Sequence, residues 1–253
     1  GATGVVCAST GNTAASASAY AARAGLMAVV LCPAGAVAPA KIAQSRAVGA
    51  RVLEVRGSFD DALRSCQELT GRGDFALVNS VNPDRIEGQK TAAFEIDEAL
   101  GRAPDVLALP YGGGGNTTAY AKGFAEDGVR PRIVAAQSAQ RATTLASAIR
   151  ISEPAHAHEV DALVDSGAAE IVTVSDEDIS RMWLEAAGEG LFCEPSSAAG
   201  LAALSQLDLE RGRTVVCVLT GHGLKDAAAV DVLTAAATVI DPTVEAILAE
   251  VRR

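Results

Sequence analysis

The sequence is poor in basic residues, in long apolar runs and in histidine, and each shortage excludes a class of function. Lysine and arginine number 21 against 31 aspartate and glutamate residues, so the formal net charge is −10. This balance disfavours a nucleic-acid-binding protein, which normally has a basic face. No run of about 18 apolar residues is free of charges or of glycine and proline breaks, so we expect no membrane-spanning helix. No signal peptide is visible, and we expect a cytoplasmic protein.

The cysteines and histidines do not form a metal-binding pattern. Five cysteines are present and none follows a spacing such as C-x-x-C. Three of them, Cys7, Cys32 and Cys217, lie in apolar strand-like runs, so we expect buried, reduced thiols. With only three histidines in the chain, a zinc site is not expected.

What the sequence does contain is a regular alternation of short apolar runs with alanine-rich helical stretches. Apolar residues make up 49% of the 253, enough for one large or two modest domains. The expected strands are 4–9, 26–33, 51–57, 75–80, 105–110, 132–138, 170–176 and 213–221. The expected helices are 13–25, 38–50, 58–73, 88–101, 116–128, 176–190, 196–207 and a tail beyond 241, with 139–168 rich in loops. This alternation predicts an α/β fold of parallel, twisted sheets flanked by helices.

A glycine run follows the strand at 105–110, where ligands of parallel sheets gather. The stretch "ALPYGGGGNTTAY" places Gly112, Gly113, Gly114 and Gly115 before Asn116, which opens a helix. Without side chains there, backbone N–H groups can converge on a phosphate at the helix N-terminus. The pattern is neither G-x-G-x-x-G nor a Walker loop, so a dinucleotide or nucleoside triphosphate is not indicated. A flexible glycine turn is the alternative interpretation.

The turn after the first strand is rich in hydroxyl and amide groups. Its polar residues are Ser9, Thr10, Asn12 and Thr13, directly before a helix. Together with the free N–H groups of the helix, they suit a carboxylate or a ring oxygen. Ordinary helix capping explains the same residues equally well.

Two further junctions are polar. In "VLTGHGLKD" (218–226), Thr220 ends an apolar strand and can offer its hydroxyl to a heterocycle nitrogen, whereas His222 alone suggests an ordinary loop histidine. In "VNSVNPDRIEGQKT" (78–91), Arg85 is suited to a bidentate contact with an anion. The alternative there is a solvated loop in which Arg85 pairs with Asp84 or Glu87.

In this order, the segments resemble pyridoxal-phosphate enzymes of the tryptophan-synthase-β-like fold type II, and specifically threonine synthases. The matching stretches are "ASTGNTAASASAYAARAG", "NSVNPDRIEGQKTAAFEI", "LPYGGGGNTTAYAKG", "FCEPSSAAG" and "VCVLTGHGLKD". The second is the most specific, because cysteine synthases and amino-acid dehydratases lack it. The glycine run departs from the Gly-Asn-Ala-Gly-Asn of threonine synthases and is partly dehydratase-like. A serine/threonine dehydratase therefore remains an alternative.

The resemblance implies a role for each site residue. Pyridoxal 5'-phosphate would be held at its phosphate by Gly112, Gly113, Gly114, Gly115 and Asn116, at its ring hydroxyl by Asn12, and at its pyridine nitrogen by Thr220. The substrate carboxylate would be bound by Ser9, Thr10 and Thr13, and the substrate phosphate by Ser80, Asn82 and Arg85. The implied reaction converts O-phospho-L-homoserine and water to L-threonine and phosphate, and a homodimer is compatible with the resemblance.

The family's chemistry also needs a lysine that forms a Schiff base with the cofactor. In the family it lies in a Ser-Phe-Lys-Asp-type motif upstream of the first strand found here. The chain has only Lys41, Lys90, Lys122 and Lys225, none of them in such a motif. We therefore expect that the N-terminal, lysine-bearing segment is missing and that the chain is inactive as it stands. A non-catalytic, ligand-binding relative is the alternative.

The resemblance also implies two domains. A smaller, mobile αβ domain over 1–88 would carry the "STGNT" turn, and a larger domain over 89–253 would carry the glycine run and "TGHG". Closure of the cleft between such domains would exclude water from the reacting groups.

Overall fold

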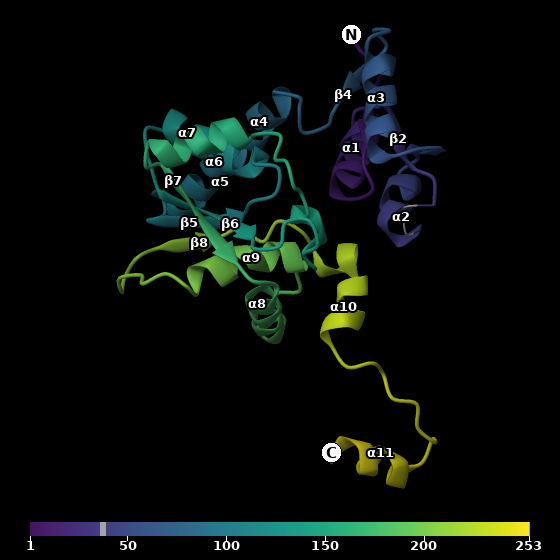
Figure 1. The fold of residues 1–253 in the computed structure, drawn as a ribbon, viewed down its shortest axis with the longest axis vertical. Coiled ribbons are helices and arrows are strands. Elements are labelled where there is room, and N and C mark those ends of the chain that lie inside the picture. Colours follow the sequence, from purple (N-terminus) through teal and green to yellow (C-terminus); the bar gives the residue numbers. More distant parts are fainter. Residues whose placement is uncertain (36–38, 253) are drawn as a thin grey trace.

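The computed structural model describes residues 1–35 and 39–252, and it contains two parallel, four-stranded sheets (Figure 1). The first sheet has the order β3-β2-β1-β4, and the second has the order β7-β6-β5-β8. The strands are β1 Gly4–Ala8, β2 Met27–Pro33, β3 Arg51–Val55, β4 Phe75–Leu77, β5 Val106–Pro110, β6 Arg132–Ser138, β7 Ala169–Val174 and β8 Val215–Cys217. The predicted architecture of two α/β domains is confirmed, while the boundary at residue 88 stays a prediction.

The first sheet is covered by helices on both faces because neighbouring side chains of a strand point to opposite sides. From β1, Val6 and Ala8 pack with the helix α3 (Phe59–Thr70), whereas Cys7 packs with α1 (Asn12–Arg23). The helix α3 begins at a capping box, in which Ser58 and Asp61 bond reciprocally. The helix α2 (Pro39–Ala47) completes this domain.

The second sheet is more deeply buried, and every residue of β5 is inaccessible to solvent. On one face, Leu107 and Leu109 pack with α5 (Thr91–Leu100) and α6 (Gly115–Glu126). On the other face lies α9 (Pro195–Leu204), backed by α8 (Asp176–Gly188). A Cβ at Gly200 would lie 2.9 Å from Cys217 Sγ and 3.5 Å from the backbone of β5, so glycine is needed for this close approach.

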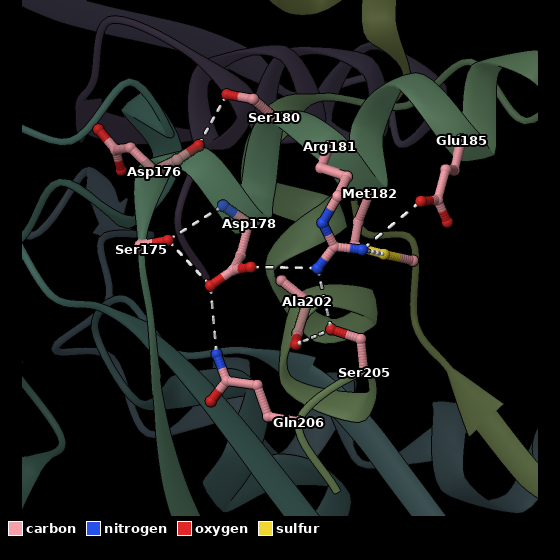
Figure 2. A network of polar contacts seen from close by, with 10 residues as sticks. All are labelled: Ser175, Asp176, Asp178, Ser180, Arg181, Met182, Glu185, Ala202, Ser205 and Gln206. Atoms are coloured by element: carbon pink, nitrogen blue, oxygen red, sulfur yellow. Dashed lines mark hydrogen bonds and ion pairs between the residues drawn. The ribbon is translucent and has the colours of Figure 1, made fainter.

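A polar network joins α8 to the end of α9 (Figure 2). Ser175 caps α8 by accepting from Asp178 N at 3.0 Å, and Arg181 donates to Asp178 at 3.1 Å and to Ser205 at 3.4 Å. Gln206 also donates to Asp178, at 3.4 Å. This network holds the C-terminal end of α9 against α8. The N-terminal end of α9 reaches the candidate site described below.

Several elements differ from the prediction. The stretch 84–89 forms a separate helix, α4 (Asp84–Gln89), because Asn82 accepts from Asp84 N at 2.8 Å and starts a turn ahead of it. The loop-rich stretch contains α7 (Ala157–Asp165) and a 3₁₀ turn, η1 (Ser147–Ile149). The C-terminal part contains η2 (Gly223–Asp226), α10 (Ala228–Leu233) and α11 (Val244–Val251), and α11 lies apart from the body in Figure 1.

The five cysteines are free, as predicted, and four are buried while Cys217 is half-buried. Burial raises the pKa of Cys7 and of Cys217 to about 12, so both thiols stay protonated near neutral pH. Among the described residues, no helix has the length and apolar character needed to span a bilayer.

Candidate active site

A cavity of about 280 Å³ lies where the carboxyl ends of both sheets meet. In each strand order the direction of winding changes beside the first strand, between β1 and β4 and between β5 and β8. Ligands of parallel sheets bind at such switch points. The residues that follow these strands and line the cavity are Asn12, Thr13, Ser80, Arg85, Gly112, Gly113, Gly114, Gly115, Asn116 and Thr220. Two switch points therefore face one cavity.

The glycine loop turns its carbonyl groups toward the protein. The Gly112 carbonyl accepts from Arg141 Nη2 at 2.9 Å, the Gly113 carbonyl accepts from His156 N at 3.0 Å, and the Gly114 carbonyl accepts from Thr118 N at 3.0 Å. In contrast, the N–H groups of residues 112–117 have no acceptor in the part of the chain that the structure describes. A buried N–H group normally has a partner, so this loop has donors available for a ligand.

These donors fit a phosphate group. They lie at the start of α6, where the helix dipole favours negative charge. The Thr118 Oγ1 atom in the first turn of α6 is buried and has no partner among the described residues. Gly114 has φ of +86°, and a Cβ there would lie 3.0 Å from His156, so the conformation of the loop depends on glycine at this position. The residues present therefore fit the phosphate end of pyridoxal phosphate.

Asn12 makes a contact between the two domains that the sequence did not predict. Its Nδ2 donates to both carboxylate oxygens of Glu194, at 2.9 and 3.1 Å. Glu194 is only 3% exposed and directly precedes α9. The amide of Asn12 is thereby held at the cavity, with its predicted contact to a ring hydroxyl still a prediction.

Thr220 lines the cavity, and its hydroxyl pairs with the hydroxyl of Ser197. Its Oγ1 lies 3.1 Å from the Oγ of Ser197, which in turn accepts from Gly221 N at 2.9 Å. Since the Ser197 hydroxyl contacts both groups, it orients the Thr220 hydroxyl on the cavity wall. One signal for Ser197 is present in the sequence, the "EPSS" stretch with Pro195 at the helix start.

Arg85 is the cation of the cavity wall. It is half-buried and has no carboxylate partner among the residues that the structure describes. Glu87, the expected alternative partner, pairs instead with Lys90 at 2.7 Å and with Lys122. Burial lowers the pKa of Arg85 below its ordinary value, yet a guanidinium remains charged in proteins. The alternative interpretation, in which Arg85 pairs with Asp84 or Glu87, does not hold among the described residues, and its contact with a substrate phosphate stays a prediction.

Three predicted site residues are not among those that line the cavity: Ser9, Thr10 and Asn82. The Ser9 hydroxyl accepts from Gly11 N and Ala14 N, both at 3.2 Å, and so caps the start of α1. Asn82 donates to the Leu77 carbonyl within its own turn. Their predicted contacts with a substrate stay predictions.

The lysines lie elsewhere. Lys90 and Lys122 bridge α4 to α6 through Glu87 and Glu126, so Lys90 is neutralised and Lys122 is paired rather than free in solvent. Lys225 lies in η2 and lines a separate hollow. None of these three lines the cavity. The side chain of Lys41 lies outside what the structure describes.

Sequence analysis assigned no role to several cavity residues. They are Ile86, Gln89, Ala148, Ile149, Ile151, His156 and Ser196. Gln89 donates to the Asn116 side chain and so joins α4 to the glycine loop. The Ser196 hydroxyl accepts from Ala148 N at 3.0 Å. Gln89 had a signal in the sequence as part of the polar turn at 78–91, and Ser196 had one as part of the "FCEPSSAAG" stretch.

Comparison with known proteins gives this cavity a chemical context. A family model described as pyridoxal-phosphate dependent enzyme matches residues 1–221. The threonine synthase of Halalkalibacterium halodurans is 47% identical over 245 residues, covering 88% of this chain and 69% of its own. That of Synechocystis is 48% identical over 246 residues, covering 89% and 64%. The chain thus spans about two thirds of the length of these relatives.

Solved structures share the fold at lower identity. Maize serine racemase has a TM-score of 0.74 at 22% identity, covering 90% of this chain and 75% of its own. A cysteine synthase from Entamoeba histolytica has a TM-score of 0.77 at 16% identity, covering 93% and 73%. These likenesses establish a shared fold and no more. With the family match over most of its length, the chain belongs to the pyridoxal-phosphate dependent enzymes, among which threonine synthases share nearly half of the aligned residues with it.

Proposed function

We propose that this chain forms the main part of a threonine synthase, which converts O-phospho-L-homoserine and water to L-threonine and phosphate. The observation that carries the proposal is Arg85, a half-buried cation without a carboxylate partner among the described residues, on the wall of the cavity. A phosphorylated substrate supplies the charge that would neutralise it. The identity to threonine synthases supports the same substrate class.

The residues of the cavity divide between cofactor and substrate. Residues 112–116 would hold the phosphate of pyridoxal phosphate, and Asn12 and Thr220 would contact its ring. When bound, the cofactor supplies an electron sink that stabilises negative charge on the substrate. The neutral Thr220 hydroxyl does not force the ring nitrogen to stay protonated, unlike a carboxylate at that place.

The substrate would lie between the cofactor and the first domain. Thr13 and the free N–H groups at the start of α1 would bind its carboxylate. Ser80 and Arg85 would bind its phosphate, so the two charged ends are held by two different junctions of the first sheet. Holding both ends fixes the carbon atoms between them relative to the cofactor.

A serine/threonine dehydratase is the second candidate, and the glycine run favours it because that run is partly dehydratase-like. A dehydratase substrate has no phosphate and would leave Arg85 unpaired. The two functions therefore differ in what Arg85 contributes to binding.

Calorimetric titration of the pyridoxal-phosphate-loaded chain with O-phospho-L-homoserine and, separately, with L-serine tests the assignment. We expect Arg85→Ala to weaken binding of O-phospho-L-homoserine by about tenfold to a hundredfold, because a charge-assisted contact is lost. Arg85→Lys should recover part of the affinity, because lysine keeps the positive charge but cannot make the two parallel hydrogen bonds of a guanidinium. Arg23→Ala, at the exposed end of α1, is the matched control and should bind as the unmodified chain does.

Two results would overturn the proposal. One is equal affinity for O-phospho-L-homoserine and for L-homoserine, which would show that the phosphate is not recognised. The other is tight binding and deamination of L-serine that Arg85→Ala leaves unchanged, which would establish the dehydratase.

A further inference from the structure

His156 lies between the two anion sites of the proposed function. It is 9% exposed, precedes α7 and lines the cavity. Its backbone N–H supports the glycine loop through the Gly113 carbonyl, at 3.0 Å. Its ring faces the other side, where Nε2 lies 2.8 Å from the carbonyl oxygen of Ser80 in the first domain. One residue therefore touches the loop that would hold the cofactor phosphate and the turn that would hold the substrate phosphate.

Both ring nitrogens of His156 face acceptor atoms. A carbonyl oxygen only accepts, so Nε2–H donates to Ser80. Nδ1 lies 3.3 Å from a carboxylate oxygen of Glu159, which also accepts when ionised. Only the protonated imidazole, with two N–H groups, satisfies both contacts. The surroundings thus accommodate a positive charge on this side chain.

We propose that His156 is a specificity-determining residue for the phosphate group of the substrate, whose protonated ring adds a second positive charge to the cavity that Arg85 lines. This inference rests on the proposed function and extends it. The Nε2–H group, now directed to Ser80 at the cavity wall, is shared with a phosphate oxygen when the ester binds. A dianion held by two cations is retained more tightly than one held by Arg85 alone.

The charged groups around His156 come from several elements. Arg85 is charged at every relevant pH and lies on the same cavity. In the segment that leads into α7, Glu159 faces Nδ1, and His158 is exposed. The pKa of Glu159 is lowered first by its own backbone hydrogen bond and then by the hydrogen bond from His156. The first turn of α6 has no acidic side chain, and Arg141 from the neighbouring loop is directed to the Gly112 carbonyl. The carboxylate that faces the His156 ring among the described residues is thus that of Glu159.

Sulfate is the probe, because it remains a dianion throughout the range in which histidine titrates. Calorimetric titration of the full chain at pH 5.5 and at pH 8.5 measures its affinity. For the unmodified chain we expect about tenfold tighter binding at the lower pH, the size of one charge-assisted hydrogen bond. In His156→Asn this ratio should fall close to one; asparagine is a favoured residue at the N-cap position, where His156 itself makes no side-chain cap bond, so α7 should be retained. The matched control is His158→Asn, which should keep the full ratio.

Proton NMR adds a readout that does not depend on a variant folding. The chain has three histidines, so their ring C2–H signals can be assigned from the two substitutions. Sulfate should move the His156 signal and leave the His158 signal in place. This change in the chemical shift of His156 should disappear in Arg85→Ala if the ion binds in the substrate subsite.

The outcomes separate this inference from the proposed function. Sulfate binding that depends on Arg85 but not on His156 or on pH would overturn the role of His156 and leave the proposed function standing. A His156 signal that still moves in Arg85→Ala would place the ion in the glycine loop and would likewise overturn it. No sulfate binding at all would count against both proposals.

Discussion

The sheets β3-β2-β1-β4 and β7-β6-β5-β8 have the same strand order, yet the turns after β1 and β5 present different groups to the shared cavity. After β1, the turn offers side chains such as Asn12 and Thr13, and it is capped by Ser9. After β5, the turn offers backbone N–H groups from glycines. The common topology decides where a ligand binds, and the residues of each turn decide which part of the ligand it takes.

The sheets also differ in how their switch points are held together. Between β1 and β4, the Asn79 side chain bridges the strand ends, donating to the Ala8 carbonyl at 2.8 Å and accepting from Ala8 N at 2.9 Å. Both sheets share one backbone bond at this place, because Val78 N donates to the Val6 carbonyl at 3.0 Å and Val218 N donates to the Ala108 carbonyl at 2.9 Å. The first sheet therefore has a side-chain clamp, that of Asn79, in addition to the backbone bond that the two sheets share.

Of the substitutions that test this comparison, Asn79→Ala should lower the free energy of unfolding the most. Two buried backbone groups of Ala8 would lose their partner, which costs about 2–4 kcal/mol in the free energy of unfolding. Urea unfolding followed by circular dichroism measures it. Asn79→Asp, which can still accept from Ala8 N but cannot donate to the carbonyl, should lose part of this amount. A loss below about 0.5 kcal/mol for Asn79→Ala, the range of ordinary surface changes, would contradict the clamp.

Gly114→Ala comes next and tests the turn after β5. A side chain at a left-handed position costs about 1–2 kcal/mol, and the Cβ would also press on His156 at 3.0 Å. We expect lower stability in urea and weaker binding of pyridoxal phosphate by absorbance titration. The control is Gly113→Ala, whose Cβ would meet only Ile151 at 3.7 Å and which should keep its stability. Equal stability of both variants would show that the loop is not held in this conformation.

Asn12→Ala should have a smaller effect, localised to the contact between the sheets. Losing the hydrogen bonds to Glu194 should cost about 1 kcal/mol and loosen the start of α1 relative to α9. Hydrogen exchange followed by mass spectrometry should show faster exchange in the first turn of α1. The control Thr10→Ala changes the same turn at a residue for which the structure describes no side-chain hydrogen bond. If both variants exchange alike, the contact with Glu194 does not hold the domains.

The smallest effect concerns the exposed ion pairs that join α4 to α6. Hydrogen bonds from Lys122 and Lys90 lower the pKa of Glu87 to about 2. Because the folded-state pKa is lowered, the stabilisation is complete above the ordinary value of 4.5 and fades as the pH falls toward 2. Glu87→Gln should therefore be slightly less stable than the unmodified chain at pH 7. The difference in melting temperature should shrink when both are measured at pH 3.5, and a constant difference would show that the pairs contribute nothing.

The polar junctions were predictable because strand and helix periods are local properties of the chain. The runs around 105–110 and 116–128 fix a strand and a helix, so residues 112–115 had to form the turn between them. For Arg85 the local pattern left two interpretations open, a contact with an anion and an ion pair with Asp84 or Glu87. Only the packing of α4 against α6 decides against the pair with Glu87, because Glu87 contacts Lys122 there.

Contacts between the domains were equally beyond the sequence. Asn12 and Glu194 are separated by 182 residues, and His156 and Ser80 by 76. No local pattern joins such pairs, because each forms only when two independently patterned sheets are placed against each other. A histidine in a loop-rich stretch has no periodic signal that would reveal what its ring faces.

The sequence alone determined the alternation of strands and helices, the glycine run and the polar turns, since these follow from residue-level conformational preference and the spacing of apolar side chains. The tertiary structure decided that four of these turns share one cavity, that Arg85 there lacks a carboxylate partner among the described residues, and that His156 lies between the two anion sites. The physical reason is that a strand order, and the placing of one sheet against another, depends on long-range burial of apolar faces, which a short window of sequence does not encode.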